Sequence, residues 1–558
     1  MVNLFRDGDW NALTGKIQFK WEPLKAMVRK AFFLLLVSFL PVIVFAQATQ
    51  TVQGKVCEQA YFEDGCLANA PGIEGVMVSN QREVVLTDEN GYYELPIEEE
   101  MVVFVSKPAD YDYLLDHENI PQFYYIHQPE GSPEFMEFSG LDPTGPLPES
   151  VDFALVPSEV QTEFTAVVFG DPQPRDHTEL SYYRDDVVYE LAGTGADMTL
   201  VLGDIMFDDL SLFDRYNRIM ATIEMPVFNI IGNHDVNFDA DQLDPDPNRF
   251  ARETYKSYYG PTYFSFEHGD VHFIAMDNMD YQGRSEETGR AIYEGYLTQT
   301  HLDWIENTLA HIPEDKLIVL LSHIPLYGME HDRGNINTLN REELFALLEG
   351  YDDVLYLGGH RHLTYQHFLG EEFGRYNPNP IHHIAATAAC GSWWSGPVQK
   401  NGVPVTTQQD GVPNGYHLFT FSGNTYTERY KAAGLPADYQ MRIESPGGSI
   451  AAEDLEETDL MVNVFNGSER SEVRYQINGG DWVEMEREEI AYSPFFTELY
   501  ADYQRNATPT NHIWSAPMPD LPEGVYRITA WTRDMYGQEF TQTKVVEVHE
   551  GRAPDESP

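Results

Sequence analysis

The chain has 558 residues, of which 42% are hydrophobic and 13% aromatic, so it can bury packed cores and is too long for one ordinary domain. Its 35 Lys and Arg residues against 90 Asp and Glu residues give a formal net charge of −55 at pH 7. A surface this acidic repels phosphate backbones and anionic membranes, which argues against nucleic-acid binding and is compatible with a saline habitat.

The N-terminus predicts export. From Met27 the chain has two basic residues, an apolar stretch over 31–45 and small residues from Ala46, which is the layout of a secretory signal. The apolar stretch is short for a membrane span. We therefore expect a leader over residues 1–49 that starts in practice at Met27, a periplasmic or extracellular protein, and no stable membrane insertion after cleavage. An uncleaved N-terminal anchor is the alternative.

The chain has three cysteines. Cys57 and Cys66 lie close together just after the leader, and in an exported protein we expect them to form a disulfide. Cys390 is left over, and we expect it to be a small buried thiol.

Residues 50–157 are predicted to form a small β-sandwich. Short apolar or alternating segments follow one another here, separated by turn residues; they are 51–56, 75–78, 83–87, 92–95 and 102–105. The run TDENGYYELP (87–96) resembles the prealbumin-like module often appended to exported enzymes.

The middle of the chain alternates buried strands with amphipathic helices, which indicates a layered α/β core. The expected strands are 164–169, 198–202, 227–231, 271–276, 317–321 and 354–357. The expected helices are about 180–191, 212–223 and 301–310.

Residues 433–549 return to a strand pattern and predict a second β-sandwich. Its expected strands include 460–464, 472–477 and 526–531, with a hairpin turn at Asn478-Gly479. Residues 550–558 are expected to be a tail.

Polar clusters follow the apolar strands of the central region. They are Gly170-Asp171-Pro172-Gln173, Gly203-Asp204, Gly232-Asn233-His234-Asp235, Ser322-His323 and Gly359-His360-Arg361-His362. Because sites in open α/β sheets form outside the carboxyl ends of the strands, these clusters are expected to converge on one edge. Carboxylate, amide and imidazole groups without thiolate are the ligands of Mn, Fe, Zn and Mg.

The ordered set D-x-Q, GD, GNHD, SH and GHRH resembles the calcineurin-like metallophosphoesterase superfamily, and the flanking β-modules resemble those of its exported bacterial branch. The resemblance implies an α/β fold: a four-layer metallophosphoesterase β-sandwich core flanked by helices over 160–432, between a small N-terminal and a C-terminal β-sandwich. It also implies two divalent metal ions, drawn from Mn, Fe, Zn or Mg. The first is expected on Asp171, Gln173, Asp204 and His362, and the second on Asp204, Asn233, His323 and His360, with Asp204 bridging.

The resemblance further implies a hydrolase of small phosphate mono- or diesters. Two metals about 3.5–4 Å apart can share a hydroxide that attacks phosphorus in line. His234 is expected to protonate the leaving oxygen as general acid. Asp235 either orients that imidazole or caps a helix.

One position departs from the superfamily pattern, because the first motif usually reads Asp-x-His and here contains Gln173. A neutral amide is a poorer zinc ligand than imidazole, so the first site is expected to prefer a harder metal or to bind more weakly. Gln173 could also support the site without touching the metal.

The loop after the last metal motif carries Trp393 and Trp394. These indoles either stack on a sugar or base of the substrate or pack beneath the loop. Arg361 and His331 are the candidate phosphate contacts, and a position on a solvated face is the favoured alternative for His331.

Two alternatives remain from the sequence. An exported nucleotidase would share the core, but the C-terminal part has a β-sandwich pattern in place of an α/β nucleoside-binding domain. A non-catalytic surface protein that binds a glycan or a partner would be expected to have lost His234, Asn233 or Asp204, and all three are present.

Overall fold

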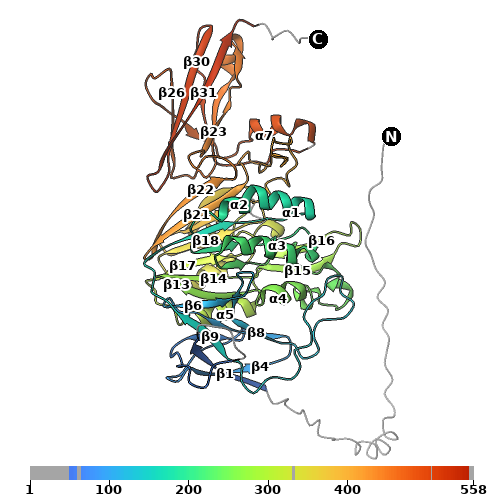
Figure 1. Cartoon of the computed structure of the whole chain (residues 1–558). Helices are drawn as coiled ribbons and strands as arrows, with labels where there is room; N and C mark the ends of the chain where they lie inside the picture. Colours follow the sequence, from blue (N-terminus) through green and yellow to red (C-terminus); the bar gives the residue numbers. More distant parts are fainter. Residues whose placement is uncertain (1–49, 60–64, 330–332, 504, 552–558) are drawn as a thin grey trace, which may run out of the picture. The chain divides into compact units, whose positions relative to one another are not determined.

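The computed structural model describes residues 50–59, 65–329, 333–503 and 505–551. The predicted leader and His331 lie outside these residues. Three layered regions follow one another along the described chain (Figure 1). Within this part of the chain, no helix combines the length and the apolar character that are needed to cross a membrane.

The N-terminal region is a β-sandwich, as the sequence predicted. One sheet has the order β4-β1-β9-β6-β7 and the other the order β3-β2-β5-β8. The strands are β1 (Gln50–Glu58), β2 (Met77–Ser79), β3 (Val84–Leu86), β4 (Tyr92–Ile97), β5 (Met101–Ser106), β6 (Tyr111–Leu115), β7 (Pro121–Gln122), β8 (Tyr124–His127) and β9 (Phe153–Pro157). Strand β5 is buried along its whole length, which explains its continuous apolar sequence.

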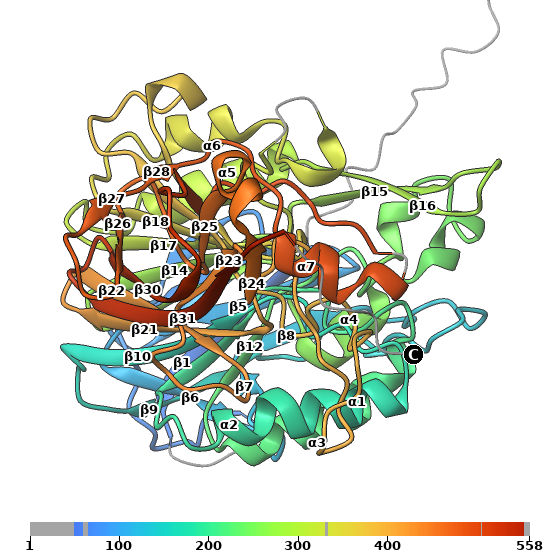
Figure 2. The same cartoon turned by 90° about the horizontal axis from the view of Figure 1, so that it is seen from above.

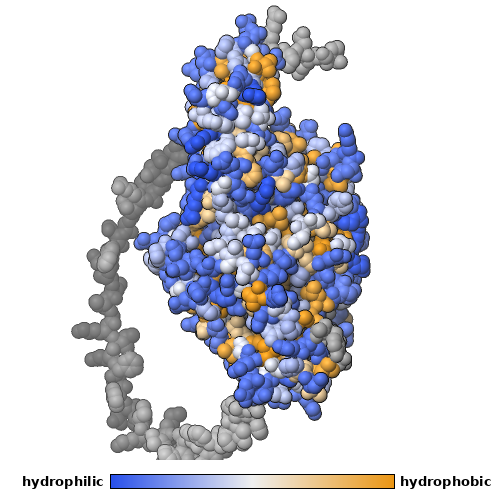
Figure 3. All heavy atoms as spheres, turned by 60° about the vertical axis from the view of Figure 1, so that its left-hand side comes forward, coloured by the Kyte–Doolittle hydropathy of each residue, from blue (hydrophilic) through white to orange (hydrophobic). Residues whose placement is uncertain are grey.

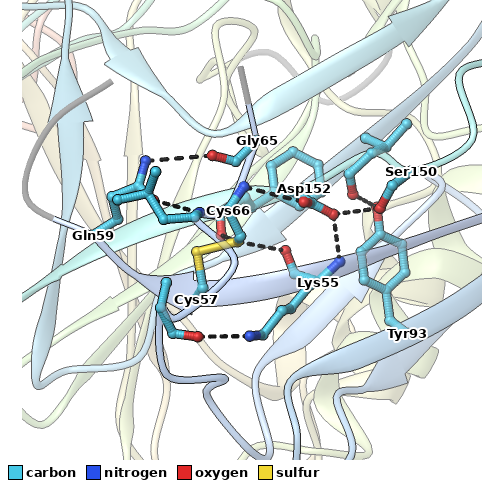
Figure 4. Close-up of a disulfide and its surroundings, with 12 residues drawn as sticks. Lys55, Cys57, Gln59, Gly65, Cys66, Tyr93, Ser150 and Asp152 are labelled. Carbon is cyan, nitrogen blue, oxygen red and sulfur yellow. Dashed lines mark hydrogen bonds between the residues drawn. A yellow bond between two sulfur atoms is a disulfide. The ribbon is translucent and has the colours of Figure 1, made fainter. Parts of the chain in front are cut away.

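The expected disulfide joins Cys57 and Cys66, with their Cα atoms 6.1 Å apart. Figure 4 shows Asp152 beside it, whose carboxylate accepts hydrogen bonds from the backbone N–H groups of Lys55 (2.9 Å) and Cys66 (3.1 Å). The disulfide and this carboxylate together fix the segment around Cys66 to strands β1 and β9. Cys390 is a buried free thiol, as expected.

Lys107, just after β5, connects this sandwich to the central region. Its ammonium group donates a hydrogen bond to the carbonyl of Glu267 (2.7 Å) and lies 3.5 Å from Nδ1 of His268. Nearby, the hydroxyls of Ser106 and Ser265 are 2.9 Å apart. The junction is therefore polar as well as apolar.

The central region contains two sheets that face each other. The first has the order β12-β11-β10-β21-β22, in which β10, β11 and β12 are parallel. The second has the order β13-β14-β17-β18-β20-β19, with β14, β17, β18 and β20 parallel. The strands are β10 (Glu163–Phe169), β11 (Met198–Val201), β12 (Val227–Asn229), β13 (Phe264–His268), β14 (Val271–Ala275), β17 (Leu317–Leu321), β18 (Val354–Gly358), β19 (Tyr365–Leu369), β20 (Ile381–Ala385), β21 (Gly415–Ser422) and β22 (Thr425–Ala432).

Helices cover the outer faces of both sheets and complete the four layers (Figure 2). Along β10, Ala166 and Val168 join the core between the sheets, whereas Val167 and Phe169 pack with residues of α1 and α3, as the period of a strand requires. Helices α5 and α6 lie over the second sheet. The helices are α1 (His177–Tyr183), α2 (Tyr189–Leu191), α3 (Phe213–Met220), α4 (Glu253–Tyr259), α5 (Gln299–Leu309) and α6 (Arg341–Leu347), and a hairpin of β15 (Met279–Arg284) and β16 (Ala291–Gly295) extends from the core.

The C-terminal region is the second predicted β-sandwich, with sheets ordered β23-β25-β29-β28 and β24-β31-β30-β26-β27. The expected hairpin turn is present, because Asn478 and Gly479 both have positive φ (51° and 77°) between β26 and β27. Its elements are β23 (Met441–Ser445), β24 (Ser449–Ala451), β25 (Asp459–Val464), β26 (Glu472–Ile477), β27 (Val483–Glu484), β28 (Glu486–Arg487), α7 (Pro494–Leu499), β29 (Ile513–Pro517), β30 (Gly524–Arg533) and β31 (Glu539–His549).

A buried polar network joins the C-terminal and central regions around Asp410. Its carboxylate accepts the N–H of Thr364 (2.7 Å) and lies 3.2 Å from Nε2 of His512, which is fully buried. Asn463 donates to the backbone carbonyl of Asp410 (2.8 Å). The C-terminal sandwich is therefore attached to the same segment that carries the last expected metal ligand, His362.

The face drawn in Figure 3 is largely hydrophilic, with apolar side chains scattered between polar ones. This agrees with the strongly acidic composition and with the ordinary share of apolar atoms on a folded surface.

Candidate functional site

The expected ligands lie in tight loops at the carboxyl ends of the strands. Asp171, Gln173, Asp204, His360 and His362 all have φ between 39° and 74°, in the left-handed region that non-glycine residues rarely adopt. This conformation turns the chain sharply out of each strand. Because it carries a cost of about 1–3 kcal/mol per residue, the surrounding contacts must hold these loops in place.

Asp171 is fully buried at the end of β10. Both of its carboxylate oxygens accept the N–H of His360, at 2.9 and 3.1 Å, and Nε2 of His362 lies 3.5 Å from Oδ1. Gly359 permits this approach, because a Cβ there would lie 2.9 Å from Oδ2 of Asp171. The first and last strand-end motifs are thereby joined.

Asp204, after β11, is the centre of the cluster. Its Oδ1 accepts the backbone N–H of His234 (2.9 Å) and lies 3.1 Å from Nε2 of His323, and its Oδ2 accepts the side-chain N–H of Gln173 (2.8 Å). A Cβ at Gly232 would lie 2.3 Å from Oδ1. The glycine of the GNHD motif is therefore needed for the close packing of Asp204.

Backbone carbonyls orient the three expected histidine ligands. Nδ1 of His323 lies 2.7 Å from the Leu202 carbonyl, and Nδ1 of His362 lies 2.7 Å from the Gly391 carbonyl, so each Nε2 is left to bind. His360 is reversed, because its Nε2 contacts the carbonyl of residue 335 and its Nδ1 faces Nε2 of His323 at 3.2 Å. Such contacts fix the tautomer of a metal-binding histidine.

Asn233, the remaining expected ligand, places its side-chain oxygen 3.1 Å from Nε2 of His323. A continuous set of contacts thus brings together all of the residues that the sequence assigned to metal binding, namely Asp171, Gln173, Asp204, Asn233, His323, His360 and His362.

The donor set fits divalent cations. Ligand atoms of Asp204, His323 and His360 lie within 4.8 Å of one another, and Oε1 of Gln173 is buried without a hydrogen-bond partner among the described residues. Burial raises the pKa of Asp171 to about 7. Burial alone would lower the pKa of His323, but the charge of Asp204 raises it to about 9. The cluster therefore attracts positive charge, which divalent metals would supply.

His234 lies beside the cluster and is not one of its expected ligands. Its Nδ1 is 2.5 Å from Oδ1 of Asp208, and its ring stacks on Phe207 with centroids 4.6 Å apart. Burial alone would lower the pKa of His234, but the charges of Asp204 and Asp208 raise it. Nε2 of His234 is consequently the nitrogen that remains for chemistry.

Asp235 has neither of its two expected roles in the structure, and Asp208, which was not among the expected site residues, lies beside His234. The Asp235 carboxylate is fully buried and accepts backbone N–H groups of Gly232 (2.9 Å), Ile205 (3.1 Å) and Met206 (3.1 Å). It binds the loops and is not the hydrogen-bond partner of the His234 imidazole. Asp208 has that position, and the sequence held only the weak signal that it follows Asp204 in the same loop.

The two adjacent indoles separate. Trp393 lies against His362 with ring centroids 4.5 Å apart and meets the edge of Phe207 at 5.9 Å. Trp394 is 3% exposed and donates from its Nε1 to Asp186 (3.0 Å), so it packs beneath the loop. Of the two indoles, Trp393 is therefore the one that borders the metal cluster.

Arg361 lies between His360 and His362 in the chain and is half-buried, and its Nε has no hydrogen-bond partner in the described part of the protein. Its charge lowers the pKa of Tyr365 and of Tyr293, although burial of both phenols dominates and raises their pKa values overall. The Tyr293 ring contacts His360 edge-on at 5.9 Å. Arg361 thus remains a candidate phosphate contact on the His360 side of the site.

Three family models match successive parts of the chain. They describe calcineurin-like phosphoesterase (residues 164–363), its N-terminal part (63–142) and its C-terminal part (382–540). Together they span the three layered regions. The C-terminal match begins at β20, inside the central region. Its start therefore does not coincide with the start of the C-terminal sandwich.

Two curated relatives are similar to part of the chain. A 3',5'-cyclic-nucleotide phosphodiesterase of Nostoc sp. is 25% identical over 198 residues, covering 35% of this chain and 63% of its own. A probable glycerophosphodiester phosphodiesterase of Arcobacter nitrofigilis is 29% identical over 174 residues, covering 30% of this chain and 56% of its own. The chain thus spans less than two thirds of the length of either relative.

Two solved structures are also similar in part. A dimetal phosphatase from Danio rerio is 14% identical, with a TM-score of 0.31, and covers 48% of this chain and 96% of its own. A purple acid phosphatase from yellow lupin is 11% identical, with a TM-score of 0.28, and covers 89% of this chain and 82% of its own.

Proposed function

We propose, from the premise that this chain belongs to the calcineurin-like phosphoesterase family, that it is an exported hydrolase of small phosphate esters with two divalent metal ions. The observation that carries the proposal is the position of Asp204, whose two carboxylate oxygens face ligands of both expected metals, Gln173 on one side and His323 on the other. A bridging carboxylate in this position suits a dinuclear site.

The residues present fit two cations. Asp171, Gln173 and His362 would hold the first with Asp204, and the second would be held by Asn233, His323 and His360 with Asp204. Bound divalent metals at such a site lower the pKa of water and neutralise the phosphoryl oxygens. Because Gln173 contributes an amide oxygen in place of an imidazole, the first position favours a harder ion such as Mn or Mg.

His234 supplies the proton for the leaving group. Asp208 holds the proton on Nδ1, which directs Nε2 toward the reacting ester, and stacking on Phe207 limits rotation of the ring. A proton donated from Nε2 stabilises the departing alkoxide, a step that typically contributes about 10²–10⁴-fold. Arg361, which lies between His360 and His362 in the chain, is the proposed contact for a phosphoryl oxygen.

A phosphodiester is the first substrate class to test. Both curated relatives are named as phosphodiesterases, and a monoester is tested beside the diester because the expected ligand set does not distinguish the two ester types. Export is supported by the Cys57–Cys66 disulfide, since disulfides persist in oxidising compartments.

The test uses the full chain loaded in turn with Mn, Fe, Zn or Mg. Hydrolysis of bis(4-nitrophenyl) phosphate and of 4-nitrophenyl phosphate is compared among the wild type, Asp204→Asn and His234→Ala, with the exposed His311→Ala as the matched control. We expect metal-dependent turnover, loss of metal and activity in Asp204→Asn, and a reduction of about 10²-fold or more in His234→Ala.

Turnover without added or bound metal, or full activity in His234→Ala, would contradict the mechanism. Two bound ions with no hydrolysis of either ester would instead favour the non-catalytic binding protein.

A further inference from the structure

The segment between α7 and β29 of the C-terminal sandwich contacts the loop that borders the metal cluster. The Tyr500 hydroxyl accepts the N–H of Thr407 (3.2 Å), and Thr508 donates its N–H to the carbonyl of Gln409 (2.9 Å). Both partners lie in the loop that follows the indole pair. Figure 1 shows α7 on the side of the C-terminal region that faces the central one. The segment around residue 505 is thereby held next to Trp393.

Arg505 uses this position to contact Trp393. Its guanidinium carbon lies 5.1 Å from the centre of the Trp393 ring, and that ring in turn packs on His362. Trp393 therefore stands between a cation of the C-terminal region and a metal ligand. With His362 and Arg505 both against it, the indole is better placed to support this arginine than to serve as an open stacking surface for a base.

A second arginine lies beside the same indole. Nη2 of Arg175 is 3.4 Å from the backbone carbonyl of Trp393, and Arg175 follows Gln173 by two residues. Its side chain is held by Glu179, which accepts from Nε at 2.8 Å. Partial burial and the neighbouring charge of Arg175 lower the pKa of Arg505. Two like charges have thus been placed close together at the site.

This pair is not neutralised. Glu179 offsets the charge of Arg175, but no carboxylate of the described residues forms an ion pair with Arg505. In a chain with 35 basic and 90 acidic residues, an unpaired arginine next to another one at the edge of a metal cluster is a local excess of positive charge. Guanidinium groups bind carboxylate and phosphate groups in a bidentate geometry, and partial exclusion of water strengthens that attraction.

We propose that Arg175 and Arg505 form a subsite for a second anionic group of the substrate, separate from the phosphate at the metals. This inference rests on the proposed function and narrows the substrate class. The substrate carries a carboxylate or a further phosphate, either on its leaving group or on the part that stays bonded to phosphorus. The C-terminal sandwich then takes part in substrate selection through Arg505.

Three matched ligands test the subsite by calorimetric titration of the metal-loaded full chain. Propylphosphonate carries one anionic group. In 3-phosphonopropionate a carboxylate replaces its methyl group, and in propane-1,3-diphosphonate a second phosphonate is attached to its terminal carbon. Because hydrogen bonds to charged groups contribute about tenfold or more in affinity, we expect the wild type to bind at least one of the two latter compounds about tenfold more tightly than propylphosphonate. The compound preferred separates a carboxylate from a phosphate as the natural group.

Variants assign the preference to the arginines. In Arg505→Gln the affinity for the ligand with two anionic groups should fall to about that for propylphosphonate. In Arg505→Lys the preference should be intermediate, because the charge remains and the bidentate geometry of the guanidinium is lost. Arg527→Gln, an exposed arginine of the same sandwich, should keep the full preference. Binding of propylphosphonate by each variant shows that the metal cluster is intact.

A wild type that binds all three ligands equally would overturn the proposal, as would an Arg505→Gln protein that keeps the preference. Ester hydrolysis is measured on the same preparations. An active wild type without the preference would refute the subsite alone, whereas an inactive wild type with bound metals would count against the proposed function.

Discussion

Oδ1 of Asp208 lies 2.5 Å from Nδ1 of His234, and the Asp208 side chain is 45% exposed whereas that of His234 is 25% exposed. A more exposed carboxylate thus orients a less exposed imidazole. The carboxylate that contacts the His234 imidazole is therefore 26 residues away in the chain and is not that of the neighbouring Asp235.

Replacing Asp208 with Asn should slow leaving-group protonation. The amide can still contact Nδ1 but no longer stabilises the protonated imidazole, so we expect a loss of about tenfold in kcat for an alkyl ester. The loss should be smaller for 4-nitrophenyl esters, whose leaving group needs little protonation. Steady-state kinetics on both ester types checks this, and equal losses on the two would show that Asp208 does not act through His234.

Replacing Asp235 with Ala should reduce stability more than it reduces proton transfer. The variant leaves three buried backbone N–H groups of Gly232, Ile205 and Met206 without their acceptor, each costing about 1–3 kcal/mol if no water replaces it. Urea unfolding monitored by tryptophan fluorescence should show a lower midpoint. If the midpoint is unchanged while the alkyl and 4-nitrophenyl esters respond as in Asp208→Asn, the assignment of roles is reversed.

Replacing Gln173 with His should shift metal preference toward zinc. An imidazole would replace the amide whose Oε1 is buried and unpaired, and nitrogen ligands suit zinc better than an amide oxygen does. The measurement is the bound Zn-to-Mn ratio after equilibration with equal concentrations of both ions. The isosteric control Gln173→Glu should move the ratio toward Mn, and an unchanged ratio in both variants would place residue 173 outside the metal's coordination.

Lys107 gives a pH-dependent prediction far from the metals. Its side chain is 4% exposed, and burial, partly opposed by Asp112 and Glu267, lowers its pKa to about 8 from the usual 10.5. Below pH 8 the free energy of unfolding is reduced by the full cost of burying the charged ammonium group. This reduction disappears as the pH rises from 8 to 10.5, because the unfolded chain then binds more protons than the folded one. That difference in pKa corresponds to about 3 kcal/mol in the limit.

The measurement compares wild type with Lys107→Met by thermal unfolding between pH 7 and 10. The stability of the wild type relative to the variant should increase with pH in this window, while groups shared by both proteins cancel. A constant difference across the window would mean that Lys107 keeps its ordinary pKa.

Much of the central fold could be predicted from the sequence. Its strands are buried on both faces, so each of them is a continuous run of apolar residues. Strand β17 has the predicted bounds, 317–321, and the loops after the predicted strands carry the residues that meet around Asp204. The first helix begins at His177, three residues before the predicted start, because Asp176 accepts N–H bonds from Thr178 and Glu179. Asp is a favoured N-cap residue, so the sequence itself carries a signal for a start at this position.

Other features depend on contacts between distant residues. Strand β21 mixes polar and apolar residues and is ordered by antiparallel pairing with β10, about 250 residues earlier, so no local pattern marks it. The indole pair separates because Trp393 and Trp394 both have positive φ (56° and 43°), which directs one ring to His362 and the other into the core. The proximity of Arg505 to that site required the docking of a separate sandwich.

The attachment of the C-terminal sandwich through Asp410 has a consequence for how such chains can be shortened or recombined. A cut near residue 433 would remove His512 and Asn463. The fully buried Asp410 carboxylate would then lose the imidazole that faces it. The Thr364 N–H on that carboxylate is two residues from His362, so the damage would spread to the metal loop. Exchange of whole C-terminal modules between homologues should therefore succeed only when both members of the Asp–His pair are kept. The central and C-terminal regions are then inherited together.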